Sequence, residues 1–579
     1  MTHEPRGKRL LASPKLPALV AFVAFLLCSP ALGAGLATED WVQRAVAQTA
    51  PTGKLWNLFD SLRTPADVAV ARSAGTAPWL TPPNLSLSFL RPLSSLWLAF
   101  DYRVLDDAAF VMHLESLALF VAAIVLAARL YRRFAAEPWV AGLATLVFAL
   151  DDAHGVLVGW LAARSALLCL VLGLGALALH DRARRDGSRK AAIGGYLLLA
   201  ASLAASELGL GVLGYFVAHA LYLDTRPGRW RALAPALGVG GAFVVLHRAL
   251  GYGARGSGLY LDPLGSPGVL SREVPARLGA LLLTELGHTP YELWLELRAT
   301  ERLAFGLGGV ALLGVLALVF LRGDPDADSV RLFRFSIAGL LLALVPAIGT
   351  FPTDRTLALA GFGGSLAVAL VVARAFARPS VLARAAALAL AALHLLLAPV
   401  LLPVKALHMV RYHERVARGV ASAYVNVVSG DDVVVALNAP DYYFCGLLRS
   451  VRHHTERGPA PPLLCLGTGQ RVDVRRVDEN SIEVRTPAGF LRYGLNELYR
   501  SRQNPLAAGT RVETQNVEVE VTSVSESGDP VAATFRFNWP LSSERLRMLA
   551  YVGDTFVPVA PPKDGEHIEV SASGVTRNP

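Results

Sequence analysis

Acidic residues stand at the turns between several long apolar runs of this chain. The groups are Glu39-Asp40, Asp151-Asp152 with His154, Glu207, and Asp354 beside Arg355. Carboxylates close to a membrane are costly unless they are solvated or take part in function. A functional carboxylate takes a proton from an attacking group or holds a cation. If all four groups face the same side of a membrane, they can line one outward-facing cavity.

Each acidic group also has a purely structural interpretation. Asp151-Asp152 can form a solvated turn that caps a helix, and Glu207 can cap the helix that follows it. Glu39-Asp40 can be a first-turn helix signal, and Asp354-Arg355 can be a local ion pair. The convergence of the four groups on one side favours the functional interpretation.

Apolar runs of membrane-spanning length must position these groups. The chain is 53% hydrophobic and only 17% charged, whereas a soluble chain carries about 25% charged residues. Because about 20 apolar residues cross a bilayer, we predict a polytopic α-helical membrane protein with about eleven transmembrane helices. The predicted spans are 16–36, 110–130, 138–150, 165–180, 192–206, 208–223, 232–247, 303–321, 335–350, 356–376 and 382–403. The first run is long for a cleaved signal peptide, which favours an uncleaved helix over cleavage near Ala34.

The distribution of Arg and Lys orients these spans. Alternate loops, such as 182–190 and 226–231, are rich in basic residues, whereas the short turns between them hold only Arg164 and Arg355. Basic loops stay in the cytoplasm, so the N-terminus is predicted inside and the C-terminus outside. The net charge of +9 is explained by this topology, and no nucleic-acid partner is expected.

The spans divide the chain into three predicted parts. Residues 1–15 form a cytoplasmic N-terminus, 16–403 a transmembrane domain with long outer loops at 37–109 and 248–302, and 404–579 an extracytoplasmic α/β, mainly β, domain. In that domain we predict a helix at 442–453 and strands at 433–437, 471–477, 481–485, 517–524, 533–537 and 555–559. Cys445 and Cys465 lie in it, and a disulfide between them is plausible in an oxidising compartment.

Several motifs follow one another along the first half of the chain. The first outer loop ends in Phe89-Leu90-Arg91-Pro92-Leu93-Ser94, a polar turn carries His154, Gly159-Trp160-Leu161-Ala162-Ala163-Arg164 comes next, and Ser206-Glu207 opens another span. In order and placement, residues 16–225 resemble the GT-C superfamily of membrane glycosyltransferases, especially protein O-mannosyltransferase-like proteins with tetratricopeptide tails. Those proteins carry a tyrosine-arginine-proline-leucine segment, a His-Pro-x-His turn, a Gly-Arg-Ala-Asp segment and a Ser-Lys-Glu segment.

This chain departs from that pattern in four places. Asp151-Asp152 replaces the His-Pro pair, and Ala166 stands where the family has an acidic residue. Ser206-Glu207 lacks the preceding lysine, and the tail is not tetratricopeptide. The scaffold can therefore be retained while activity or substrate has changed.

The resemblance implies a polyprenyl-phosphate-linked sugar as donor and an extracytoplasmic protein or glycan as acceptor. Glu39 or Asp40 would then be the catalytic base. The departing lipid phosphate would be bound by Arg91, Arg164 and Arg355. A divalent cation, magnesium or manganese, would be held by Asp151, Asp152 and His154, with Glu207 and Asp354 in support. The implied location is a bacterial inner membrane, in contact with its lipids, with the tail in the periplasm.

Two other functions remain open. A non-catalytic envelope scaffold of the same fold would tolerate alanine at Glu39 and Asp40. A transporter or flippase would place ionisable residues at the bilayer midplane or use paired broken helices, and the sequence shows neither.

Overall fold

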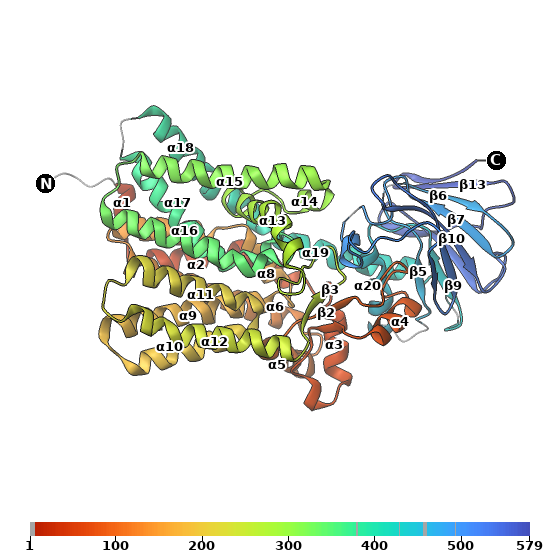
Figure 1. The fold of residues 1–579 in the computed structure, drawn as a ribbon, viewed down its shortest axis with the longest axis horizontal. Helices are drawn as coiled ribbons and strands as arrows, with labels where there is room; N and C mark the ends of the chain where they lie inside the picture. Colours follow the sequence, from red (N-terminus) through yellow and green to blue (C-terminus); the bar gives the residue numbers. More distant parts are fainter. Residues whose placement is uncertain are drawn as a thin grey trace.

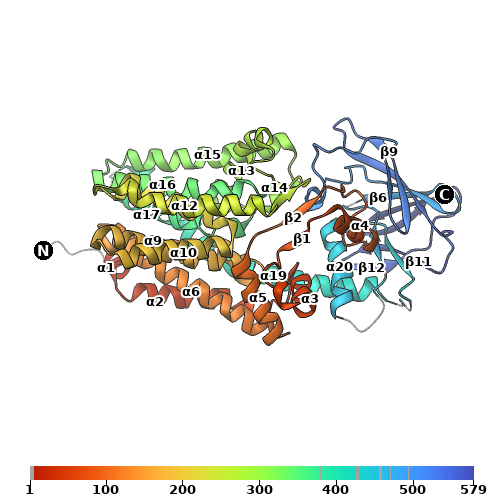
Figure 2. The same cartoon turned by 60° about the horizontal axis from the view of Figure 1, so that its bottom comes forward.

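The computed structural model describes residues 6–377, 380–425, 427, 429–455, 460–469, 471–492 and 494–578. A bundle of long helices makes up one end of the elongated molecule, and a β-rich region makes up the other (Figure 1). A view turned by 60° shows the same division (Figure 2). Residues 1–5 of the predicted cytoplasmic segment lie outside the described residues. We call the end of the bundle that meets the β-rich region its C-domain end.

Seven helices of the described chain are long and apolar enough to cross a membrane. They are α2 (Leu16–Cys28) with η1 (Ser29–Gly33), α6 (Ala109–Phe134), α9 (Arg164–Asp186), α12 (Arg229–Ala249), α15 (Ala299–Leu321), α16 (Ala327–Ile348), and the continuous α18 (Val381–Ala392), η6 (Leu393–Leu397) and α19 (Ala398–Ala423). An eighth span results if α7 (Pro138–Ala149) and α8 (Ala153–Gly159), bent by 53° at their break, count together. The remaining predicted spans correspond to shorter helices: α10 (Arg189–Ala205), η3 (Glu207–Gly209) with α11 (Leu210–Ala218) and η4 (His219–Leu223), and α17 (Ala360–Phe376).

One bundle helix was predicted only as part of the second outer loop. Helix α13 (Pro267–Gly287) packs along α15. A Cβ placed on Gly279 would lie 1.9 Å from the carbonyl oxygen of Gly306, so the two backbones touch. Small residues permit this close packing of apolar helices. Pro275, inside the helix, lowers the helical signal of the segment in sequence.

The two long loops form one small layer at the C-domain end. The first contributes α3 (Asp40–Thr49), η2 (Thr52–Lys54), β1 (Asp60–Leu62), α4 (Pro65–Ala74), β2 (Ser86–Ser88) and α5 (Pro92–Val104). The second contributes β3 (Gly253–Arg255) and α14 (Glu292–Glu296). Strand β2 pairs antiparallel with both β1 and β3, so the two loops share a three-stranded sheet.

The C-terminal region contains two sheets. A mixed four-stranded sheet has the order β12 (Thr555–Pro558), β11 (Leu546–Val552), β4 (Val433–Ala436), β5 (Leu463–Cys465), and α20 (Tyr442–Thr455) packs against it. An antiparallel seven-stranded sheet has the order β14 (Gly574–Asn578), β13 (His567–Ser571), β6 (Arg471–Arg476), β7 (Ser481–Arg485), β10 (Pro530–Phe537), β9 (Val517–Val524), β8 (Arg511–Glu513). Helix α19 runs without interruption through the predicted boundary at 403 and packs against β12 and α20. Cys445 and Cys465 are both buried and free.

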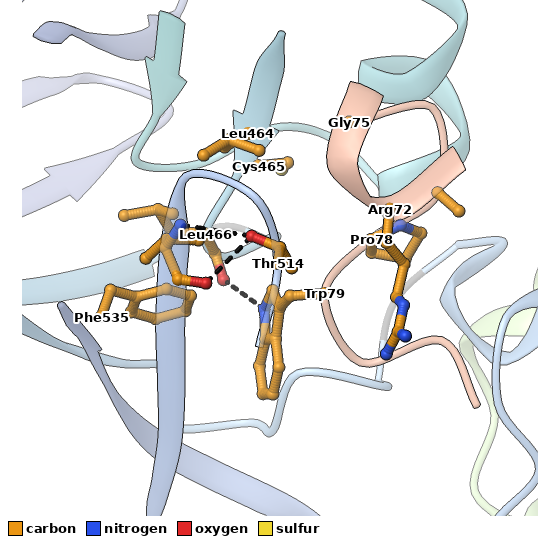
Figure 3. Close-up of a pocket in the computed structure, with 11 residues that line it drawn as sticks. Arg72, Gly75, Pro78, Trp79, Leu464, Cys465, Leu466, Thr514 and Phe535 are labelled. Carbon is orange, nitrogen blue, oxygen red and sulfur yellow. Dashed lines mark hydrogen bonds between the residues drawn. The ribbon is translucent and has the colours of Figure 1, made fainter. Parts of the chain in front are cut away.

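The first loop is anchored to the C-terminal region by Trp79. Its indole stands edge-on to Phe490 and Phe535, with ring centroids 5.4 and 5.5 Å away. The indole nitrogen donates a hydrogen bond of 3.3 Å to the carbonyl oxygen of Leu466 (Figure 3). Nε of Arg500, in the C-terminal region, also donates a hydrogen bond to the carbonyl oxygen of Leu80 in the first loop. The loop layer is therefore held between the bundle and the sheets.

Candidate functional site

A group of ionisable side chains is buried at the C-domain end of the bundle. We call it the acid cluster; its members are Asp151, Asp152, Glu285, His288, Asp354 and Lys405. The break between α7 and α8 produces its first two members. Helix α7 ends at Ala149, α8 begins at Ala153, and Oδ1 of Asp151 accepts a 2.9 Å hydrogen bond from the Ala153 amide. The bend turns both aspartates inward, where they are almost fully buried.

Asp152 is bound through both of its carboxylate oxygens. Nδ1 of His288 lies 2.5 Å from one oxygen, and Nζ of Lys405 lies 2.6 Å from the other. The same ammonium lies 2.8 Å from Oδ2 of Asp354. Nε2 of His288 lies 2.8 Å from Nδ1 of His394, which belongs to the π-helical segment η6. Asp152 thus connects the break between α7 and α8 with the end of α13, through His288, and with α19, through Lys405.

Asp151 and Glu285 meet beside the start of α17. A Cβ placed on Gly361 would lie 3.5 Å from Oε1 of Glu285 and 3.8 Å from Oδ2 of Asp151. On Gly364 it would lie 2.5 Å from the same Glu285 oxygen, so only glycine leaves room for that carboxylate. Both carboxylates therefore lie against the first turn of α17, where they are buried.

The predicted metal ligands are placed only in part as expected. One ligand atom each from Asp151, Asp152 and His288 lies within 4.8 Å of the others, so an Asp-Asp-His cluster exists. His154 is not its histidine, which corrects the prediction. Nε2 of His154 bonds the Phe148 carbonyl oxygen at 3.0 Å, because the first turn of α8 points the ring back onto α7.

The contacts of this cluster do not suit a divalent ion. Such an ion needs free oxygen and nitrogen atoms. Here Oδ1 of Asp152 and Nδ1 of His288 are bonded to each other, and the second Asp152 oxygen holds the Lys405 ammonium. An ion at the centre would displace one bond and lie next to a like charge. We therefore assign no chemical step to a metal.

The two predicted catalytic carboxylates have different surroundings. Asp40 is fully buried and accepts hydrogen bonds from the Ala37 amide at 3.0 Å and the Ala162 amide at 2.8 Å. Burial raises the pKa of Asp40 to about 8 against the opposing effect of these bonds. Glu39 is only half-buried and accepts a 3.0 Å hydrogen bond from the hydroxyl of Tyr443 on α20. Asp40 thus joins two backbone segments, whereas Glu39 is the more exposed of the two carboxylates.

The three predicted phosphate-binding arginines also differ. Arg164 is buried and pairs with Asp101 and, at 3.0 Å, with Glu115. Arg91 pairs with Glu207 at 2.8 Å. Both charges are therefore compensated within the protein.

Arg355 is the exception among the three. In the part of the chain that the structure describes, it forms no ion pair. Its guanidinium bonds the Tyr260 hydroxyl and lies 5.2 Å from the centre of the Trp160 ring. Burial lowers the pKa of Arg355, but the hydroxyl of Tyr260 and the charge of Glu39 outweigh this effect and raise it. Arg355 is thus the one of the three arginines whose charge no carboxylate among the described residues pairs with.

Asp354 connects Arg355 to the acid cluster because it directly precedes this arginine. Burial raises the pKa of Asp354 to about 7, although the Lys405 ammonium opposes the rise. Asp101, Glu285, His288, His394 and Lys405 were not predicted from the sequence as site residues. Lys405 lies two residues beyond the last predicted span, so an extension of that span past Pro403 is the signal that would have included it.

No family model matches the chain. No curated protein matches it either. Solved structures that are similar to it include the oligosaccharyltransferase of Archaeoglobus fulgidus in the apo form, with 12% identity and a TM-score of 0.39. The oligosaccharyltransferase AglB from Archaeoglobus fulgidus, in complex with an inhibitory peptide and a dolichol-phosphate, has 10% identity and a TM-score of 0.39. Each alignment covers 78% of this chain and 65% of the archaeal one, so the chain spans less than two thirds of their length.

A bacterial structure is similar at the same level. ArnT from Cupriavidus metallidurans bound to undecaprenyl phosphate has 13% identity and a TM-score of 0.37, covering 77% of this chain and 85% of that one. The identities of these three structures are too low to assign the chain to a family, and the roles of its residues follow from its own geometry.

Proposed function

We propose that this chain is a membrane glycosyltransferase that moves a sugar from a polyprenyl-phosphate donor to a hydroxyl of an extracytoplasmic protein or glycan. In this proposal the N-terminus lies in the cytoplasm of a bacterium, about eleven helices span the inner membrane, counting the shorter ones, and the C-domain end faces the periplasm. The observation that carries the proposal is a half-buried Glu39, which accepts a hydrogen bond from Tyr443 of the C-terminal region, at the same end of the bundle as Arg355, which forms no ion pair among the described residues.

The reaction needs a base and a cation on opposite sides of one carbon atom. Glu39 accepts the proton of the acceptor hydroxyl as its oxygen bonds to the anomeric carbon. The bond from that carbon to the phosphate oxygen breaks, and the electron pair leaves with the lipid phosphate. Arg355, whose planar guanidinium suits a phosphate, stabilises the charge that grows on the leaving oxygen. The products are the glycosylated acceptor and a polyprenyl phosphate.

Aromatic side chains surround this pair. Trp160 and Phe351 lie beside the Arg355 guanidinium, at 5.2 and 5.9 Å from their ring centres. The hydroxyl of Tyr260 accepts a hydrogen bond from Arg355, and the hydroxyl of Tyr443 donates one to Glu39. Amphipathic rings of this kind suit a place where a polar sugar and an apolar lipid chain meet.

The test is transfer of radiolabelled sugar from polyprenyl-phosphate donors by membranes that contain the intact chain. We expect Glu39→Gln to lower transfer by about 10²–10⁴-fold, the usual contribution of a general base. Arg355→Met should lower it by about 10²–10³-fold, as for loss of a donor to a developing anion. Asp107→Asn and Arg255→Met alter exposed residues of the two long loops and serve as controls that make the same kind of charge change.

The outcomes separate the proposal from its main alternative. Loss of transfer in Glu39→Gln at normal expression supports the enzyme. Full transfer in both site variants would refute these assignments, and no transfer from any donor would favour the scaffold. Reporter fusions at Gly187 and Gly565 test the orientation, because a cytoplasmic tail places Glu39 in the wrong compartment.

A further inference from the structure

Lys405 is a buried cation that bridges two carboxylates from different parts of the bundle. Its Nζ lies 2.6 Å from Oδ2 of Asp152, at the break between α7 and α8, and 2.8 Å from Oδ2 of Asp354, in the segment before α17. Only 15% of its side chain is exposed. Cross-linking of carboxylates from separate elements is what a divalent ion does in an acidic site. We propose that the ammonium of Lys405 takes the place of a divalent metal ion in the acid cluster, so that the protein holds no metal there.

The backbone is shaped to bring this lysine into the cluster. A Cβ placed on Gly155 of α8 would lie 2.5 Å from the carbonyl oxygen of Leu402 and 2.9 Å from Cβ of Lys405. Helices α8 and α19 therefore touch where the lysine leaves α19, and only glycine permits that contact. Next along α8, a Cβ on Gly159 would lie 3.1 Å from Cγ of Met409. Helix packing therefore places Cβ of Lys405 against α8, and the side chain reaches the two carboxylates from there.

The ligand atoms that Asp152 and His288 would offer are already engaged, whereas Oε2 of Glu285 and Oδ1 of Asp354 accept no hydrogen bond among the described residues. His288, a non-glycine residue with φ of 52°, ends α13 and gives its Nδ1 to Asp152 at 2.5 Å. Its other nitrogen lies 2.8 Å from His394. A metal would have to break the Asp152–His288 bond and then lie within a few ångströms of the ammonium, where two like charges repel. A buried charge that loses its partner is also costly, which opposes displacement of the lysine.

This arrangement gives Lys405 a positioning role. Asp354 directly precedes Arg355, so the ammonium fixes the segment that carries the free guanidinium. The inference concerns the charge balance of the cluster, goes beyond the proposed function and does not depend on it.

The test uses the full chain purified in detergent, with readouts that need neither donor nor acceptor. We would measure bound metal by elemental analysis, Mn²⁺ binding by electron paramagnetic resonance, and thermal unfolding with EDTA or added MnCl₂. The variants are Lys405→Met, which keeps the length and removes the charge, and Lys405→Arg, which keeps the charge. Lys54→Met removes an exposed lysine of the first loop and is the control.

We expect the unaltered protein to hold far less than one equivalent of metal and to unfold at the same temperature with EDTA or MnCl₂. Lys405→Met should unfold several degrees lower, because two buried carboxylates lose their counter-charge, and Mn²⁺ should restore part of the loss. Lys405→Arg should behave like the unaltered protein. One tightly held equivalent of metal whose removal by EDTA lowers the unfolding temperature would overturn the proposal. So would a Lys405→Met protein as stable as the parent, and the metal measurement decides the matter if that variant does not fold.

Discussion

Removal of the Arg164 side chain distinguishes a structural role from a donor-binding role. Arg164 is 2% exposed and contacts Asp101, Glu115 and the hydroxyl of Ser116. Asp101 is fully buried, so Arg164→Met leaves a carboxylate without its counter-charge. Breaking a buried pair in this way costs about 3–5 kcal/mol. We therefore expect a large loss of stability, visible as an unfolding temperature lower by many degrees.

The variant Asp101→Asn supplies the matched test of this cause. In the Arg164→Met background it removes the uncompensated charge, so the double variant should recover most of the lost stability. Alone, Asp101→Asn should cost less than Arg164→Met, because Glu115 still pairs with Arg164 at 3.0 Å. Thermal unfolding of purified protein, followed by intrinsic fluorescence, measures all three. A non-additive double variant demonstrates that the two residues are coupled.

One result would refute this reasoning. If Arg164→Met unfolds at the parental temperature but loses sugar transfer and donor binding, then Arg164 binds the donor phosphate, as the sequence resemblance implied. Transfer by Arg164→Met membranes should instead fall only in proportion to the amount of folded protein. Quantitative immunodetection of the inserted chain provides that correction.

Three further predictions follow from the same contacts. Burial raises the pKa of Asp40 from 3.8 to about 8, so folding takes up a proton at pH values between these two. The free energy of unfolding should therefore fall by up to about 1.4 kcal/mol per pH unit as pH rises through that window. Thermal unfolding of Asp40→Asn at the same pH values should lack this slope. Tyr443→Phe, which removes the hydrogen bond to Glu39, should lower transfer several-fold, because the hydroxyl of Tyr443 orients that carboxylate; unchanged transfer by Tyr443→Phe membranes counts against the contact. Trp79→Ala should cost about 3–5 kcal/mol and expose the first loop to limited proteolysis, and an unchanged digestion pattern would contradict its anchoring role.

Local patterns in the sequence predicted much of the C-terminal region. Strands at 481–485 and 517–524 have the predicted bounds, because alternation of apolar and charged residues, as at Glu518 and Glu520, is a signal that neighbouring residues alone create. Strand β11 was missed because Leu546 to Val552 is nearly continuous in apolar character at the centre of its sheet. The sequence did not predict helix α13 or the extension of α19 past residue 403, and both helices contain a proline in their interior, which weakens a helical pattern.

The candidate site shows where sequence patterns end. Turn positions predicted that four acidic groups would line one cavity. Asp151, Asp152 and Asp354 lie in the acid cluster, whereas Glu39 contacts Tyr443 and Glu207 pairs with Arg91. The partners of these aspartates came from elsewhere: Lys405 from a helix that passes the predicted boundary and His288 from a helix taken for a loop. A pairing between segments more than a hundred residues apart leaves no local signal, so His154, the nearest histidine in sequence, was chosen in its place.

The C-terminal region contacts both the candidate base and the loop layer, so it is not an independent module. Tyr443 reaches Glu39 from α20, while the loop layer that carries Glu39 is anchored to the sheets by Trp79. An acceptor approaching Glu39 therefore meets side chains of both regions at once. If the acceptor contacts the C-terminal region beside Glu39, exchange of that region should change which acceptor is used without changing the donor. In the proposed reaction Arg355 contacts the donor phosphate, so an altered acceptor preference with an unchanged donor is the expected result of that exchange, and a changed donor would contradict it.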